Sequence, residues 1–405
     1  ATPINNRLTD FRHMIELFSR KEEAFFSRTL GIHNLRSHFS QLEKKLRSHL
    51  GEEADNIGEN IAEAQFLLEK DVVFEKLVVQ RSRAYAKESQ VREHGQSAAF
   101  PERRKPQVAE YSIRKTYGSL LDMVEKAFSS KTPLFSLSVY YPLQYYIGDK
   151  EIDAFTETRL RNVVSLIRTQ FLKRFESSVY AFETSCDRLL KKMLAWLEIH
   201  CEGKAERGRL NRWIAENEDT LNHTSQKQQD MWGEEEDDEL IPQELLDKAE
   251  EEKLDRKEYE VSEIIKDTFL DLDQIVKFLE ETRKFKPAQD DKLKKLLRLL
   301  NSKEFADKKV IIFTEFADTA RYLEQQLKEN GITGLERVDG GSSGKRYDVV
   351  KRFAPYYNGM SSAMLEEQGM EEIRVLVATD VLSEGLNLQD GTRLINYDIH
   401  WNPVR

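Results

Sequence analysis

The strongest constraint on the fold is a series of short apolar runs near the carboxyl end, rich in β-branched residues. The runs cover residues 308–316, 335–340, 373–380 and 392–399. The segments between them have helical periodicity, and Gly331 stands where the helix that precedes the second run would be capped. Continuous apolar strands that alternate with amphipathic helices are typical of a parallel sheet covered on both faces. We therefore expect an α/β lobe at the carboxyl end.

The chain before about residue 300 has a mostly helical pattern. Two apolar stripes recur in steps of three and four, which indicates a buried face on each of two long helices. The stripes are Phe175, Val179, Phe182, Cys186, Leu189 and Met193, and Val261, Ile265, Phe269, Leu272, Val276 and Leu279. We expect these helices to pack antiparallel. Between them, the polar residues 211–252 contain the acid block 234–239 and predict a solvated connector.

The net charge limits how the chain could contact nucleic acid. The formal charge is −10, whereas a protein that binds through its overall field carries excess Lys and Arg, so any contact must come from a local surface. No apolar run approaches the ~20 residues of a bilayer crossing, and the amino end lacks a signal-peptide pattern. We expect a cytoplasmic protein without membrane contact, and an amino end that is a cut edge.

Candidate metal and nucleotide motifs are incomplete in this sequence. Cys186 and Cys201 have no CxxC spacing, so neither a zinc site nor a disulfide framework is indicated. Residues 339–346 (DGGSSGKR) resemble a P-loop, but Asp339 and Arg346 replace its first glycine and its magnesium-binding Ser or Thr. Residues 238–241 (DELI) lie in an acid run, not after an apolar strand. The chain by itself therefore lacks the usual cradle for a triphosphate and Mg²⁺.

Four segments resemble conserved motifs of superfamily-two helicases of the SWI/SNF type, in their usual order. Residues 1–6 (ATPINN) resemble motif III and residues 310–316 (VIIFTEF) motif IV. Residues 377–391 (VATDVLSEGLNLQDG) resemble motif V, and residues 395–405 (INYDIHWNPVR) the strand that leads into motif VI. Residues 77–83 with 100–103, and residues 172–178 (LKRFESS), are similar to segments of bacterial members of this group.

The resemblance implies a fold and a domain organisation for the chain. We expect residues 1–20 to end a first RecA-like lobe and residues 21–290 to form a helical insertion, with an extended linker near 100–111 and the acidic connector near 211–252. Residues 291–405 are expected to form a truncated second RecA-like lobe. In this family two lobes close on ATP and Mg²⁺ while nucleic acid lies across both. The P-loop, the DExH box and the arginine finger would lie outside this chain.

Motif V carries most of the site residues that the resemblance implies. Thr379, Asp380 and Ser383 would contact the DNA backbone at the end of a buried strand. Glu384, Gly385 and Asn387 would approach the nucleotide, where a glycine lets the backbone come close. Glu384 could equally be a surface acid in a salt bridge.

Other motifs supply further candidates, each with a plainer alternative. Thr314, Gly341, Ser342 and Ser343 could form a phosphate nest at strand ends, or the glycines could be an ordinary turn. Thr2 would couple the phosphate site to the nucleic-acid surface, or merely cap a helix. Trp401, Asn402 and Pro403 match the start of motif VI, where a lone Trp could instead be core. Arg81, Arg83 and Arg103, beside Arg104 and Lys105, form the best basic cluster, unless they are merely solvated.

These features predict part of an ATP-dependent translocase on double-stranded DNA, and its helical insertion suggests antiviral defence. Two alternatives remain. A strand-separating DNA or RNA helicase would have an ATPase that responds only to single strands. A non-catalytic module would use the helical insertion to dock a protein partner, and its complete sequence would carry no P-loop or DExH box.

Overall fold

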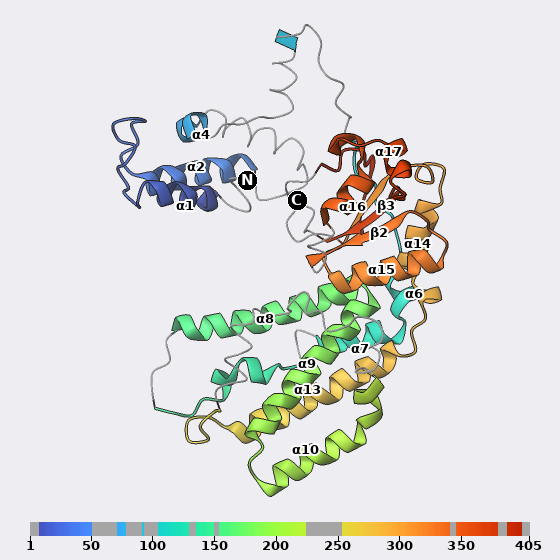
Figure 1. The fold of residues 1–405 in the computed structure, drawn as a ribbon. Coiled ribbons are helices and arrows are strands. Elements are labelled where there is room, and N and C mark those ends of the chain that lie inside the picture. Colours follow the sequence, from blue (N-terminus) through green and yellow to red (C-terminus); the bar gives the residue numbers. More distant parts are fainter. Residues whose placement is uncertain are drawn as a thin grey trace. The chain divides into compact units, whose positions relative to one another are not determined.

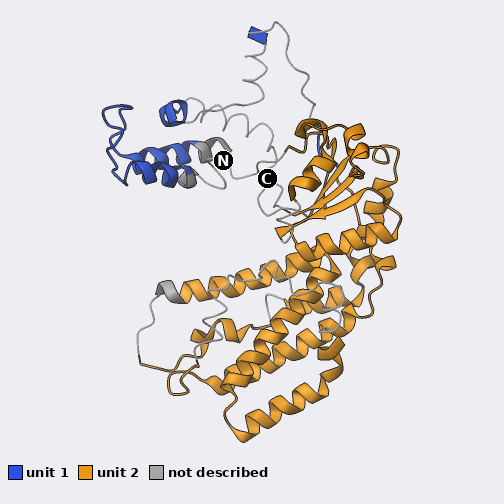
Figure 2. Ribbon diagram, in the orientation of Figure 1, with its two compact units in different colours: residues 1–107, 401–405 blue, residues 108–400 orange. Residues whose placement is uncertain are grey.

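The computed structural model describes residues 8–50, 71–77, 91–92, 104–128, 135–149, 154–223, 253–340, 346–379 and 387–398. These residues fall into two compact units, shown in Figure 2: residues 1–107 with 401–405, and residues 108–400. Each unit has its own apolar core. The domain boundaries expected from the resemblance stay a prediction.

The first unit is a small helical cluster of α1 (Leu8–Phe18), α2 (Leu35–Leu50) and α4 (Val72–Leu77). Its core joins the three helices, with the ring centroids of Phe11 and Phe74 4.5 Å apart. Asp71 begins α4, because its carboxylate accepts hydrogen bonds from the backbone N–H groups of Val73 (3.0 Å) and Phe74 (3.4 Å). The same carboxylate lies 2.8 Å from Nε2 of His38 on α2, which ties the two helices together.

The second unit begins with a helical region, followed by the lobe (Figure 1). Its elements are α6 (Ile113–Tyr117), α7 (Ser119–Ala127), η1 (Ser138–Tyr140), η2 (Pro142–Tyr145), α8 (Ala154–Ser177), α9 (Val179–His200), α10 (Lys204–Glu216) and α13 (Val261–Thr282). One large core cluster joins these elements. Among the described residues, no helix is long and apolar enough to cross a membrane.

The two predicted apolar stripes are buried where α9 and α13 pack side by side. The helices are antiparallel, since His200 at the end of α9 bonds to Leu254 shortly before α13 begins. One expectation was wrong: the first stripe does not lie on a single helix. Ser178 is extended (φ −160°, ψ 157°) and caps α9 by accepting a hydrogen bond from the N–H of Ala181, so Phe175 belongs to α8.

The structure also differs from the expected connector at its start. Residues 211–223 are largely helical, as the end of α10 and, after a turn at Asn217, a further helical segment over 218–223. Trp213 is buried in the helical core and its Nε1–H donates to Asp273 on α13 over 2.7 Å. This one aromatic side chain in a polar sequence is enough to dock the segment, because burying it stabilises the helix by several kcal/mol, of the order of 3–5. Residues 224–252, with the acid block, lie outside the described residues.

The carboxyl-terminal lobe is the expected α/β fold. It contains η3 (Pro287–Gln289), α14 (Asp291–Leu300), β1 (Val310–Phe313), α15 (Ala317–Glu329), β2 (Leu335–Val338), α16 (Arg346–Phe353), η5 (Tyr356–Asn358), α17 (Ser362–Glu367), β3 (Val375–Ala378) and β4 (Arg393–Asn396). The strands lie in the order β2-β3-β1-β4, and every neighbouring pair is parallel. The four apolar runs therefore form one sheet, as predicted.

The side chains of alternate residues of β1 are buried on opposite faces of this sheet. Val310 and Ile312 lie in the cluster that includes α14 and α15, whereas Ile311 lies in the cluster with Val349 and Phe353 of α16. The predicted end of the helix before β2 is also confirmed. Gly331 has φ +79°, and its N–H donates to the carbonyl of Lys328 at the end of α15. Helices thus cover both faces and leave the strand ends free for a site.

Candidate site at the carboxyl edge of the sheet

The four parallel strands end at one edge, which is where open α/β sheets bind their ligands. A polar residue follows each strand: Thr314 after β1, Asp339 after β2, Thr379 after β3 and Asp398 after β4. All four are largely buried, with exposed fractions of 1% for Asp339 and 4% for Thr314 and Thr379. Because a buried polar group without a hydrogen-bond partner is destabilising, these side chains must form polar contacts at the edge of the sheet.

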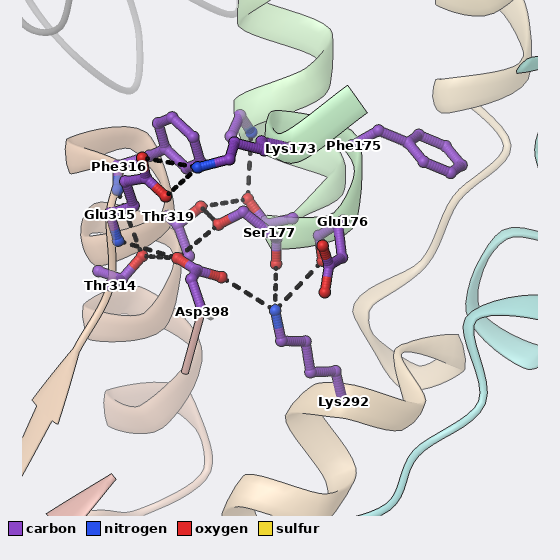
Figure 3. Close-up of polar contacts among 12 residues, drawn as sticks. Lys173, Phe175, Glu176, Ser177, Lys292, Thr314, Glu315, Phe316, Thr319 and Asp398 are labelled. Atoms are coloured by element: carbon purple, nitrogen blue, oxygen red, sulfur yellow. Dashed lines mark hydrogen bonds and ion pairs between the residues drawn. The ribbon is translucent and has the colours of Figure 1, made fainter. Parts of the chain in front are cut away.

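Asp398 is the centre of a polar cluster at this edge (Figure 3). One carboxylate oxygen, Oδ2, accepts hydrogen bonds from the hydroxyl of Thr314, from the backbone N–H of Glu315 (2.9 Å) and from the hydroxyl of Ser177 (2.9 Å). The other, Oδ1, lies 3.0 Å from Nζ of Lys292. The carboxylate therefore joins the ends of β1 and β4 to α8 and α14.

Lys292 is a buried cation whose ammonium group contacts a carboxylate, two backbone carbonyls and two aromatic rings. Besides Asp398, its ammonium donates to the backbone carbonyls of Glu176 and Ser177 over 3.2 Å each. The rings of Tyr397 and Tyr111 lie 4.1 Å and 5.5 Å from Nζ, close enough for cation–π attraction. Burial, together with the nearby carboxylates of Glu176 and Asp398, raises the pKa of Tyr111 to about 12, so this phenol stays neutral.

Residues 172–178 make several of the polar contacts from the helical side. Lys173 pairs with Glu315 at 3.3 Å, and Arg174 pairs with Asp318 at 2.8 Å. The Arg174 side chain is 2% exposed, and its guanidinium lies over the ring of Phe316 at 4.7 Å from the centroid. This segment therefore docks the α8–α9 junction onto the loop between β1 and α15.

Sequence reasoning did not identify Lys292, Asp398 or Ser177 as site residues. The available signals were the LKRFESS resemblance, to which no role was assigned, and the position of Asp398 next to the predicted motif VI. Their proximity depends on a contact between residues 177, 292 and 398, and no local pattern reports such a contact.

Three of the predicted site residues lie within the described part of the chain. Thr314 and Thr379 are buried at the carboxyl edge, where the N–H of Thr379 donates to the carbonyl of Val338. The hydroxyl of Thr314 is engaged by Asp398. Asn387 is exposed and lies beside η5, where its Nδ2 donates weakly to the carbonyl of Tyr357 at 3.4 Å. The predicted roles of these residues stay predictions.

The other predicted site residues lie outside the described residues: Thr2, Arg81, Arg83, Arg103, Gly341, Ser342, Ser343, Asp380, Ser383, Glu384, Gly385, Trp401, Asn402 and Pro403. Of the basic cluster, the described members Arg104 and Lys105 are exposed. Within the described ranges no group of three or more His, Cys, Asp or Glu side chains could hold a metal ion. The resemblance assigns Mg²⁺ to the first lobe, so that expectation stays untested.

Comparison with known proteins agrees with the α/β fold of the lobe. Residues 291–405 match the helicase conserved C-terminal domain. The chain is also similar to YqhH of Bacillus subtilis (strain 168), described as an uncharacterized ATP-dependent helicase, with 37% identity over 111 residues. That match covers 27% of this chain and 17% of the relative, so the chain spans less than a fifth of the relative's length. No solved structure matches. These similarities agree with a helicase-like fold for residues 291–405.

Proposed function

We propose that this chain is part of a SWI/SNF-type ATPase of the bacterial branch, which couples ATP hydrolysis to movement along double-stranded DNA. The observation that carries the proposal is the parallel sheet of residues 310–396, whose carboxyl edge collects buried polar residues and lies within the match to the helicase C-terminal domain. The order of motifs III to VI in the sequence supports the SWI/SNF type.

In this proposal the chain supplies one half of a nucleotide site. A P-loop and a DExH acid on the first lobe would hold ATP and Mg²⁺, and arginines beyond residue 405 would offset charge on the transferring phosphoryl group. Glu384, Gly385 and Asn387 would face the nucleotide from this lobe, and Thr2 would couple the two lobes.

DNA would lie along the same edge, held by short polar side chains and the basic cluster. Thr379, Asp380 and Ser383 would contact phosphates, together with the nest at 341–343. Thr314 would act with them only if its hydroxyl left Asp398; in the conformation described here it holds Asp398 instead. Arg81, Arg83 and Arg103 would give the local positive charge that a chain of net charge −10 needs.

An oligonucleotide-displacement experiment with the full-length protein tests movement along duplex DNA. The substrate is a duplex with a third strand bound in its major groove, and the readout is ATP-dependent release of that third strand. We expect release of the third strand while the two duplex strands stay paired. Separation of the duplex strands instead would identify a strand-separating helicase, and release without ATP would contradict a motor.

The basic cluster gives a second test of the same proposal. Replacing Arg81, Arg83 and Arg103 together by Gln removes up to three phosphate contacts, so the slope of log binding constant against log salt concentration should fall by about 2–3. The binding constant and its slope are measured by fluorescence anisotropy with a labelled duplex. Replacing the exposed residues Lys204, Arg212 and Lys277 together by Gln provides a control triple variant with the same change in charge. An unchanged slope in the Arg81, Arg83 and Arg103 variant would show that these arginines do not contact DNA phosphates.

A further inference from the structure

The hydroxyl groups at the α8–α9 junction form a directed chain that ends on Asp398. Ser177 Oγ lies 2.9 Å from Asp398 Oδ2 and must donate to it, because an ionised carboxylate only accepts. A hydroxyl has a single proton, so Thr319, at 2.7 Å, must donate to Ser177. Ser178, at 2.8 Å, must in turn donate to Thr319. The polarity of the chain is therefore fixed from Ser178 through Thr319 and Ser177 to Asp398.

This chain begins at the first turn of a long helix. Ser178 is the residue that caps α9, and its oxygen also accepts from the N–H of Ala181 at 3.1 Å. Any rotation of α9 against the lobe must therefore break or lengthen a bond in the chain. Thr319 is fully buried on α15, and Ser177 and Ser178 are almost fully buried, so water cannot easily replace a lost bond.

The other end of this hydrogen-bond chain lies close in sequence to the segment that resembles the start of motif VI. Asp398 stands three residues before Trp401, the first residue that the resemblance assigns to motif VI. It is also bound to the end of β1 through Thr314 and Glu315. In the proposed ATPase, a displaced Asp398 would act on the motif that follows it in sequence, and a shift of about 1 Å in a catalytic group can cost a hundredfold in rate.

We propose that Asp398 is a positioning residue through which the α8–α9 junction sets the rate of ATP hydrolysis by this lobe. The inference rests on the proposed ATPase function. Lys292 holds the second carboxylate oxygen and the carbonyls of Glu176 and Ser177, so it keeps the helical and strand partners of Asp398 in one arrangement. The orientation of the helical region then determines the position of Asp398 at the edge of the sheet that would face the nucleotide.

Paired substitutions at Thr319 in the full-length protein test the proposal. Thr319→Val keeps the shape of the side chain and removes the hydroxyl, whereas Thr319→Ser keeps the hydroxyl. We expect Thr319→Val to lower kcat for ATP about tenfold with KM changed less than twofold, and Thr319→Ser to stay within twofold of the wild type. The thermal midpoint of each variant is measured beside its kinetics, and kcat is taken well below that midpoint.

A second pair of variants tests whether the effect passes through Asp398. Lys292→Met should lower kcat about tenfold, whereas Lys294→Met on the exposed face of the same helix should leave it unchanged. Because Thr319 and Lys292 act on one carboxylate, we expect the double variant to lose clearly less than the hundredfold product of the single effects.

The outcomes separate this inference from the proposed function. A wild-type protein that hydrolyses no ATP overturns both. A wild-type ATPase whose Thr319→Val variant keeps full kcat overturns the inference alone, even if its thermal midpoint falls, because that pattern is structural. Equal losses in Thr319→Val and Thr319→Ser, or multiplicative losses in the double variant, also overturn it.

Discussion

Asp271 in the middle of α13 offers a sharp test of how the helical region is held together. Its carboxylate accepts hydrogen bonds from the N–H groups of Ser136 and Leu137, each at 2.7 Å, and from the Ser136 hydroxyl at 3.0 Å. Leu137 is fully buried in the left-handed region (φ 59°), where a leucine is strained. The carboxylate therefore fixes a strained loop onto the helix.

The expected effect of Asp271→Ala is the sum of opposing contributions. Two backbone N–H groups lose their partner in a buried place, at roughly 1–3 kcal/mol each. Burial raises the pKa of Asp271 from 3.8 to about 6, so the ionised carboxylate itself costs ~3 kcal/mol at neutral pH, a cost that the variant avoids. The strained loop, once free, would relax and lose the burial of Leu137, worth about 1.5–3 kcal/mol. These contributions sum to a net loss of roughly 0.5–6 kcal/mol, centred near about 3 kcal/mol.

The measurement is denaturant unfolding at pH 7, followed by the fluorescence of Trp196 and Trp213 in the same core. Glu280→Ala, an exposed acid on the same helix, is the matched control and should change the free energy of unfolding by less than about 0.5 kcal/mol. If Asp271→Ala matches this control, the carboxylate does not hold the loop.

The pH dependence of the Asp271→Asn variant provides an independent check. A folded pKa above the unfolded value means that the contribution of Asp271 is largest below pH 3.8 and is lost as the pH rises through about 6. Lowering the pH from 7 to 5 should therefore stabilise the wild type relative to Asp271→Asn by ~1.4 kcal/mol. A constant difference would show that Asp271 titrates normally.

Two further substitutions test local features of the second unit. Burial lowers the pKa of His200, whose Nε2 accepts from the N–H of Leu254, so its contribution is full above pH 6.5 and is lost as the pH falls below it. Relative to His200→Gln, the wild type should lose stability in denaturant melts between pH 7 and pH 5; a gain would contradict the neutral imidazole. Gly334 has φ +60°, and an added Cβ would lie 3.3 Å from the backbone of Arg374, so Gly334→Ala should cost about 1–2 kcal/mol in the same melts. A neutral effect would show that this turn adapts.

The lobe could be predicted from sequence because its strands carry their signal locally. Residues 375–378 (VLVA) are apolar without alternation, a pattern that favours a strand buried on both faces of a sheet. The end of α15 was equally local, since Gly331 adopts a conformation that other residues rarely tolerate. Both features depend on a few neighbouring residues, so the local sequence is enough to predict them.

The features that sequence reasoning missed depend on contacts distant in the chain. The first stripe continues through Ser178 without a break in its spacing, so only the capping geometry shows that two helices meet there. Asp398 and Lys292 are ordinary charged residues in sequence, and their importance comes from a pairing over 106 positions. Trp213 likewise gave no local sign that it would dock α10 onto α13.

Steady-state ATP hydrolysis by the full-length protein shows whether this lobe belongs to the proposed motor driven by duplex DNA. Hydrolysis is measured alone, with duplex DNA, and with each separated strand at the same nucleotide concentration. We expect duplex DNA to raise kcat severalfold above the rate with either single strand. A rate that rises only with single strands, or no hydrolysis under any condition, would contradict it.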